Sequence, residues 1–86
     1  MKEIIKKTYY DSFEKVLSGE KKFDIRLADE DYEEGDILVL KEIDKERNFT
    51  GRELRKKITF VLKTKDCDFW KKGDIDKFGF AVLSLE

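Results

Sequence analysis

Four charged residues at the start of one predicted strand form the group best suited to chemistry in this sequence. The segment from Gly19 to Arg26 reads GEKKFDIR, and it places Lys21, Lys22, Asp24 and Arg26 close together. Lysine offers a mobile positive charge and arginine a planar set of donors, so the combination suits a phosphate or another anionic group. Asp24 could orient these cations or accept a hydrogen bond from the edge of a base.

The same residues also allow a purely structural interpretation, in which Asp24 pairs with Arg26 on an exposed strand. Such exposed pairs stabilise a protein by roughly 0–1 kcal/mol. Catalysis would need more, because Lys21 would have to be desolvated to act as a general base and Asp24 would have to be protonated to act as an acid. The flanking cations favour an ionised Asp24, and therefore an orienting or ion-pairing role.

Two elements must position this segment, a helix before it and a strand within it. Apolar residues recur at helical spacing from about Tyr9 to Ser18, and Gly19 is the residue type that most often follows a helix end. From 21 to 27 the period changes to two. The apolar residues Phe23, Ile25 and Leu27 then fall on one side of a strand, and Lys22, Asp24 and Arg26 on the other.

The remaining sequence reads as strands and turns. An apolar run marks a strand at 37–40, a polar hairpin loop follows at 44–51, and 65–77 is irregular or a single helical turn. In the next strand Leu54, Ile58, Phe60 and Leu62 are predicted to share one face, with Lys56 breaking the pattern. Short strands at 3–6 and 78–85 complete the order. We therefore expect an α+β fold, a small curled β-barrel of five to six mostly antiparallel strands with one main helix.

Composition limits the possible functions. The 86 residues suffice for a single domain, 1–86, and its formal charge of −1 argues against a uniformly basic surface. Histidine is absent and Cys67 is the only cysteine, so we expect no disulfide, no metal site and no cofactor. The acidic stretch at 29–36 does not fit a calcium-binding loop. No apolar run is long enough to cross a membrane, and we expect a cytoplasmic protein.

Three further residues are candidates for ligand contacts. Trp70 lies beside two lysines and could stack on a base or fill the core, and Tyr32 presents the same alternatives. Arg52 begins the most basic run of the chain, although strand alternation splits that run between two faces. Cys67 lies between two aspartates, which disfavour a thiolate, so it is not a candidate nucleophile.

The segment GEKKFDIR, followed by YEEGDILVLKEI and FTGREL, resembles the ASCH domains of the PUA-like superfamily, especially small bacterial families of unknown function. The resemblance spans nearly the whole chain. It implies a small β-barrel with a helix beside it, and a cleft between them lined by the Gly-x-Lys segment. Some ASCH proteins are amidohydrolases that act on N4-acetylcytidine with a lysine and a threonine of this motif. Lys21 matches that lysine, whereas Asp24 occupies the threonine's position.

Three functions therefore remain open. The leading hypothesis is an RNA- or nucleotide-binding module that uses a basic cleft between helix and barrel. The second is an amidohydrolase acting on a modified nucleoside, with Lys21 and Asp24 as the candidate catalytic residues. The third is a protein-interaction module, which suits the near-neutral charge and the many surface carboxylates.

Overall fold

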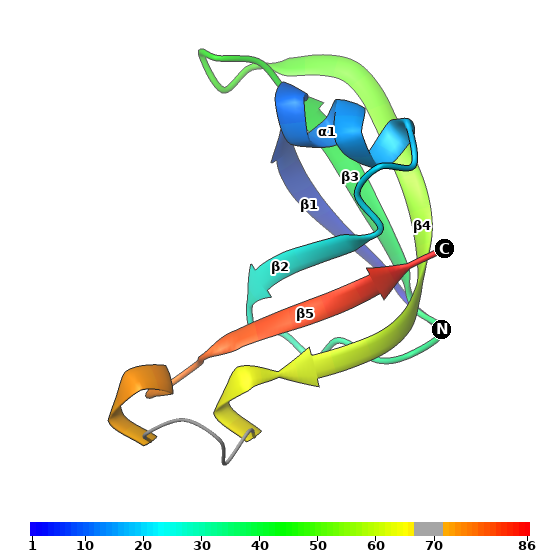
Figure 1. The fold of residues 1–86 in the computed structure, drawn as a ribbon. Helices are drawn as coiled ribbons and strands as arrows, with labels where there is room; N and C mark the ends of the chain where they lie inside the picture. The colour runs from blue at the N-terminus through cyan, green and yellow to red at the C-terminus, as the bar shows by residue number, and fades with distance from the viewer. Residues whose placement is uncertain (67–71) are drawn as a thin grey trace.

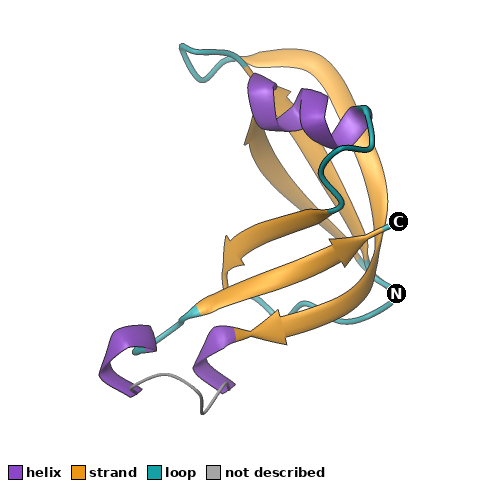
Figure 2. Cartoon of the chain, in the orientation of Figure 1, coloured by secondary structure: helices purple, strands orange, loops and turns teal. Residues whose placement is uncertain are grey.

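A computed structural model describes residues 1–66 and 72–86 of the chain. It contains one α-helix, two short 3₁₀ segments and five strands, which is the expected α+β class. Figure 1 shows their order, and Figure 2 shows how strands dominate the molecule. The elements are β1 (Glu3–Tyr9), α1 (Tyr10–Leu17), β2 (Phe23–Leu27), β3 (Ile37–Ile43), β4 (Phe49–Lys63), η1 (Thr64–Asp66), η2 (Lys72–Ile75) and β5 (Phe80–Leu85).

The strands form one mixed sheet in the order β1-β3-β4-β5-β2. β1 pairs with β3 in parallel, whereas the pairings β3–β4, β4–β5 and β5–β2 are antiparallel. β2 therefore pairs with the last strand of the chain and not with its neighbour in sequence. The segment 28–36 between β2 and β3 is therefore a crossover and not a hairpin connection.

The sheet is curled but open, so the expectation of a closed barrel is wrong. β1 and β2 stand at its two edges and do not pair with each other. The curl comes from β4, whose fifteen residues belong to both halves of the sheet and which curves across the whole molecule in Figure 1. A barrel requires backbone hydrogen bonds between its first and last strands. Here side chains span that gap instead.

The core lies inside the curl, between α1 and the two halves of the sheet. Phe13 and Val16 of α1 are fully buried, because they lie on one face of the helix. Val16 also belongs to the main apolar cluster inside the sheet. This cluster comprises Ile4, Val16, Tyr32, Leu38, Leu40, Ile58, Ala81, Leu83 and Leu85.

In two strands, β2 and β4, apolar side chains that the alternating sequence pattern would place toward the core are exposed instead. On β2, Asp24 points inward and is 4% exposed, whereas Ile25 is 52% exposed. On β4 the register shifts between Ile58 and Phe60, so Phe60 is exposed while Ile58 is buried. An extra residue in a strand reverses the facing of every residue after it. The predicted common face of Leu54, Ile58, Phe60 and Leu62 is therefore wrong beyond Ile58.

Among the described residues, no helix is long and apolar enough to cross a membrane. Within the same residues, no group of three or more histidine, cysteine, aspartate or glutamate side chains is placed to hold a metal ion.

Candidate functional site

The junction between α1 and β2 turns the chain back across the end of the helix. Ser18 caps α1, and Gly19 follows with a φ of +86°, a conformation that glycine adopts at little cost. The backbone N–H of Lys21 then donates to the carbonyl of Lys15 at 3.0 Å. This turn fixes where Lys21 and Lys22 begin, so the charged segment starts from a defined backbone.

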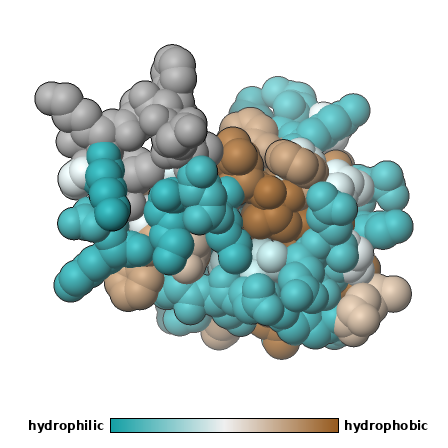
Figure 3. Space-filling view, turned by 90° about the horizontal axis from the view of Figure 1, so that it is seen from below, coloured by the Kyte–Doolittle hydropathy of each residue, from teal (hydrophilic) through white to brown (hydrophobic). Residues whose placement is uncertain are grey.

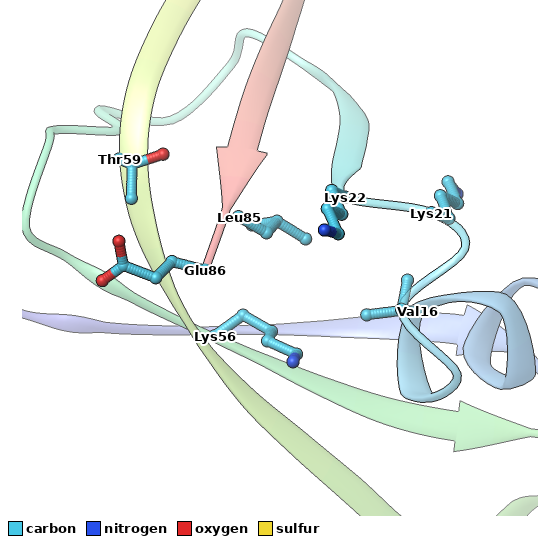
Figure 4. A pocket seen from close by; sticks show the side chains of 8 residues that line it. Val16, Lys21, Lys22, Lys56, Thr59, Leu85 and Glu86 are labelled. Carbon is cyan, nitrogen blue, oxygen red and sulfur yellow. The ribbon is translucent and has the colours of Figure 1, made fainter.

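One side of this junction borders a pocket of about 400 Å³, which we call the lysine pocket. Its wall combines the end of α1, the junction, the middle of β4 and the end of β5. In Figure 4 the side chains of Lys22 and Lys56 approach the same opening from two sides, and Lys21 lies farther along the junction. The pocket is lined by Val16, Gly19, Lys21, Lys22, Lys56, Thr59, Leu85 and Glu86.

The lysine pocket holds two ammonium groups that form no direct ion pair with a described residue, although the carboxylate of Glu86 also lines the pocket. In the described part of the chain, no carboxylate lies within 4.0 Å of the ammonium group of Lys22 or Lys56. Lys56 stands opposite Leu38 on β3 and is partly buried on the core side of the sheet. Its stem can therefore cover apolar surface while its ammonium reaches the pocket rim. Val16 and Leu85 add apolar surface to the same wall.

A second group of polar residues, the seam cluster, lies where the edge strands β1 and β2 approach each other. Arg26 donates from Nε to Asp24 Oδ2 at 2.6 Å and from Nη2 to Thr8 Oγ1 at 2.8 Å. Its Nη1 donates to the carbonyl of Lys7 on β1 at 3.0 Å. Each nitrogen of this guanidinium is thus bonded to protein, and Arg26 links the two open edges of the sheet.

Lys21 joins the seam cluster to α1. Its Nζ donates to Ser12 Oγ at 2.6 Å and lies 4.0 Å from Asp24 Oδ1. Asp24 is buried, so the two cations beside it compensate for the loss of its hydration. A shallow pocket of about 260 Å³ opens over Ser12, Lys21, Asp24 and Arg26. The cluster brings an amine, a hydroxyl and a buried carboxylate to one opening.

Comparison with known families adds a finding of its own. Residues 5–85 match the model of the family described as "Domain of unknown function (DUF3850)". The chain belongs to the DUF3850 family. No curated protein matches this DUF3850 domain at the significance required.

The structure places the predicted residues of this DUF3850 domain in four separate locations. Lys21, Asp24 and Arg26 meet in the seam cluster, and Lys22 lies in the lysine pocket with Lys21 at its edge. Tyr32 is buried in the core cluster, and Arg52 contacts the middle of α1 through Phe13 and Glu14. Trp70, like Cys67, falls outside the described residues.

Tyr32 is a core residue in this domain. It is 3% exposed, and its hydroxyl is buried without a hydrogen-bond partner among the described groups. Burial raises the pKa of this hydroxyl. Lys6 Nζ lies 5.9 Å from the centre of the ring. The ring is therefore covered in the free protein and does not offer an open stacking surface.

Arg52 is held by two carboxylates. Its Nε donates to Glu42 Oε1 at 3.0 Å and its Nη2 to Glu42 Oε2 at 2.8 Å, and it also forms an ion pair with Glu14. The guanidinium lies 4.9 Å from the ring centre of Phe13, so it covers the buried helix face. Thr50 donates a further hydrogen bond to Glu42 Oε1 at 2.6 Å. Arg52 is committed to joining α1 to the β3–β4 hairpin.

Sequence reasoning missed Lys56, Thr8 and Ser12. Lys56 did leave a signal, since it interrupts the apolar alternation of its strand, and that interruption marks an inward-facing cation beside the pocket. Thr8 and Ser12 left none, because a threonine and a serine near a helix start are common as capping residues. The partner of Thr8 follows only from the approach of β1 to β2, and that of Ser12 only from the path of the α1–β2 junction.

Proposed function

We propose that this domain binds RNA or a nucleotide-like ligand in the lysine pocket. The observation that carries the proposal is the approach of Lys22 and Lys56, distant in sequence, to one pocket without a carboxylate partner. Two such ammonium groups offer up to six N–H donors to phosphate oxygens. The apolar surface of Val16 and Leu85 suits the face of a base or a ribose, and the volume lies within the usual range for small-ligand sites.

The resemblance to ASCH domains supports the same proposal. In those domains the cleft between helix and sheet is lined by a Gly-x-Lys segment, and here Gly19 and Lys21 both line the lysine pocket. We propose on this basis that the domain is a PUA-like relative with an open sheet. The seam cluster would then serve as the support that holds Lys21 and the start of β2 beside the pocket.

The test is a titration with a short fluorescent RNA of mixed sequence, followed by anisotropy at several salt concentrations. Lys22→Ala combined with Lys56→Ala should weaken binding at least about tenfold. It should also reduce the slope of log K against log salt by about 1.4, the value for two phosphate contacts on a single strand. Lys45→Ala combined with Lys57→Ala is the matched control, since it removes the same charge from exposed positions outside the pocket. Equal losses in both double variants would assign the binding to net charge and not to the pocket.

The seam cluster favours a second candidate function, hydrolysis of an amide on a modified nucleoside. It holds Lys21 Nζ at 2.6 Å from the Ser12 hydroxyl and 4.0 Å from the Asp24 carboxylate, beside a surface pocket. Incubation with N4-acetylcytidine and chromatography of the products tests this candidate. Release of cytidine that Lys21→Met abolishes and Lys22→Ala retains would support it, and no release by the wild-type protein would end it.

A further inference from the structure

The outer face of β2, β5 and β4 carries a continuous apolar surface, which we call the outer patch. The strand registers arrange it in rows across the three strands. In Figure 3, which views the molecule from below, apolar side chains gather into a patch bordered by hydrophilic ones. One row contains Phe60, Ser84 and Phe23, the next contains Leu62, Val82 and Ile25, and the last contains Phe80 and Leu27.

The large side chains of the outer patch are far more exposed than core positions. Six of them, three phenylalanines and three aliphatic residues, are each 43–53% exposed. A phenylalanine side chain covers about 150–250 Å² when buried, so half-exposed residues of this size present roughly 600 Å² together. This area reaches the upper limit of roughly 300–600 Å² for the largest apolar patch on an ordinary monomer. It also approaches the roughly 800 Å² that each partner contributes to a standard protein interface.

The chemistry of the patch selects its partner. None of the eight side chains in the three rows carries a charge. Two copies of this face can therefore meet without placing like charges opposite each other, which is what a two-fold symmetric interface requires. Single-stranded RNA would instead need cations among the aromatic rings to reach its phosphates. Within the described residues, the cation over a ring of this patch is Lys21, 5.3 Å from the centre of Phe23, and its ammonium is already bonded to Ser12 beside Asp24. Ser84 lies between Phe60 and Phe23, which leaves a low point that a ring from the other copy can fill.

We propose that a second copy of this chain covers the outer patch, so that two domains pair face to face through β2, β5 and β4. Sheets that pack this way lie about 10 Å apart with interdigitated side chains. The exposed apolar alternation of β2 and the register shift in β4 then share one explanation, since both turn large apolar residues toward the partner. Leu85 of the lysine pocket points to the opposite face of β5 from Val82, so pairing leaves that pocket accessible in each copy.

Sedimentation velocity across a wide range of protein concentration tests the proposal. The wild-type chain should sediment with twice its monomer mass at high concentration. Phe60→Lys and Ile25→Lys should each raise the dimer dissociation constant at least about 30-fold, the loss expected at a central interface residue. Both positions are about half exposed, so the monomer should keep its fold, which circular dichroism checks.

Phe49→Lys is the matched control. Phe49 lies on the same strand as Phe60 and is similarly exposed, 59% against 53%, but it stands at the other end of β4 beside Ile43. This variant should dimerise as the wild type does. A wild-type chain that stays monomeric at every concentration would overturn the proposal, as would equal losses from Phe49→Lys and Phe60→Lys. Amide shifts at Phe23, Phe60 and Phe80 on adding RNA to a monomeric chain would instead assign the face to nucleic acid.

Discussion

Replacing Glu42 with glutamine should weaken the protein at neutral pH and have little effect near pH 2. Glu42 is buried, and its carboxylate accepts hydrogen bonds from Arg52 and Thr50. The Arg52 guanidinium is the main cause that lowers the pKa of this carboxyl from 4.5 to about 2, and the Thr50 hydroxyl adds to the effect. A glutamine side chain keeps the shape but loses the negative charge.

The magnitude follows from linkage between protonation and folding. A carboxyl whose pKa falls to about 2 on folding stabilises the folded state fully above its unfolded pKa of 4.5, and this contribution is lost as pH falls through 2. The full shift would correspond to about 3 kcal/mol. Because Arg52 is about half exposed and screened by solvent, we expect about 2 kcal/mol.

Urea unfolding of wild type and Glu42→Gln from pH 7 to pH 2 measures this difference directly. The difference in unfolding free energy should stay near 2 kcal/mol down to about pH 5 and then shrink toward zero. Glu53→Gln is the control, because Glu53 is exposed on β4 and forms no ion pair within the described residues. A Glu42→Gln difference that stays constant with pH would refute the assignment of Glu42 as an ionised partner of Arg52.

Two further predictions concern the seam and a tight turn. Arg26→Met should lower the unfolding free energy, measured by urea unfolding, by about 3 kcal/mol, because it leaves the buried Asp24 without its main partner. Adding Asp24→Asn to this variant should restore part of the lost unfolding free energy. Full stability of Arg26→Met alone would show that the seam does not depend on this ion pair. Gly79→Ala should lower the melting temperature more than Gly35→Ala, although both glycines have positive φ. An added Cβ at Gly79 would lie 2.7 Å from a side-chain atom, whereas an added Cβ at Gly35 would meet open space. Equal shifts in thermal unfolding would contradict the steric part of this argument.

Local patterns in the sequence were enough to predict most of the elements. The helix, its end near Gly19, and the order of one strand, one helix and four strands all match the structure within a few residues. These features depend on the spacing of apolar residues and on glycine's access to positive φ, which act over short stretches of chain. Alternation also placed Asp24 and Arg26 on one side of their strand, because alternate residues of a strand lie on one side. It grouped Lys22 with them, whereas the structure brings Lys21 to the seam cluster and Lys22 to the lysine pocket.

The sequence by itself determined the composition of the charged segment, the α+β class and the absence of histidine chemistry. Only the tertiary structure decided what each charge does. Pairing of β2 with β5 left β2 at an edge, so Arg26 bonds across the gap to β1 while Lys22 meets Lys56 in the lysine pocket. The register shift in β4 turned Phe60 outward. Both outcomes depend on contacts between residues far apart in the chain. The local spacing of residues does not determine which distant strand will pair with a given strand.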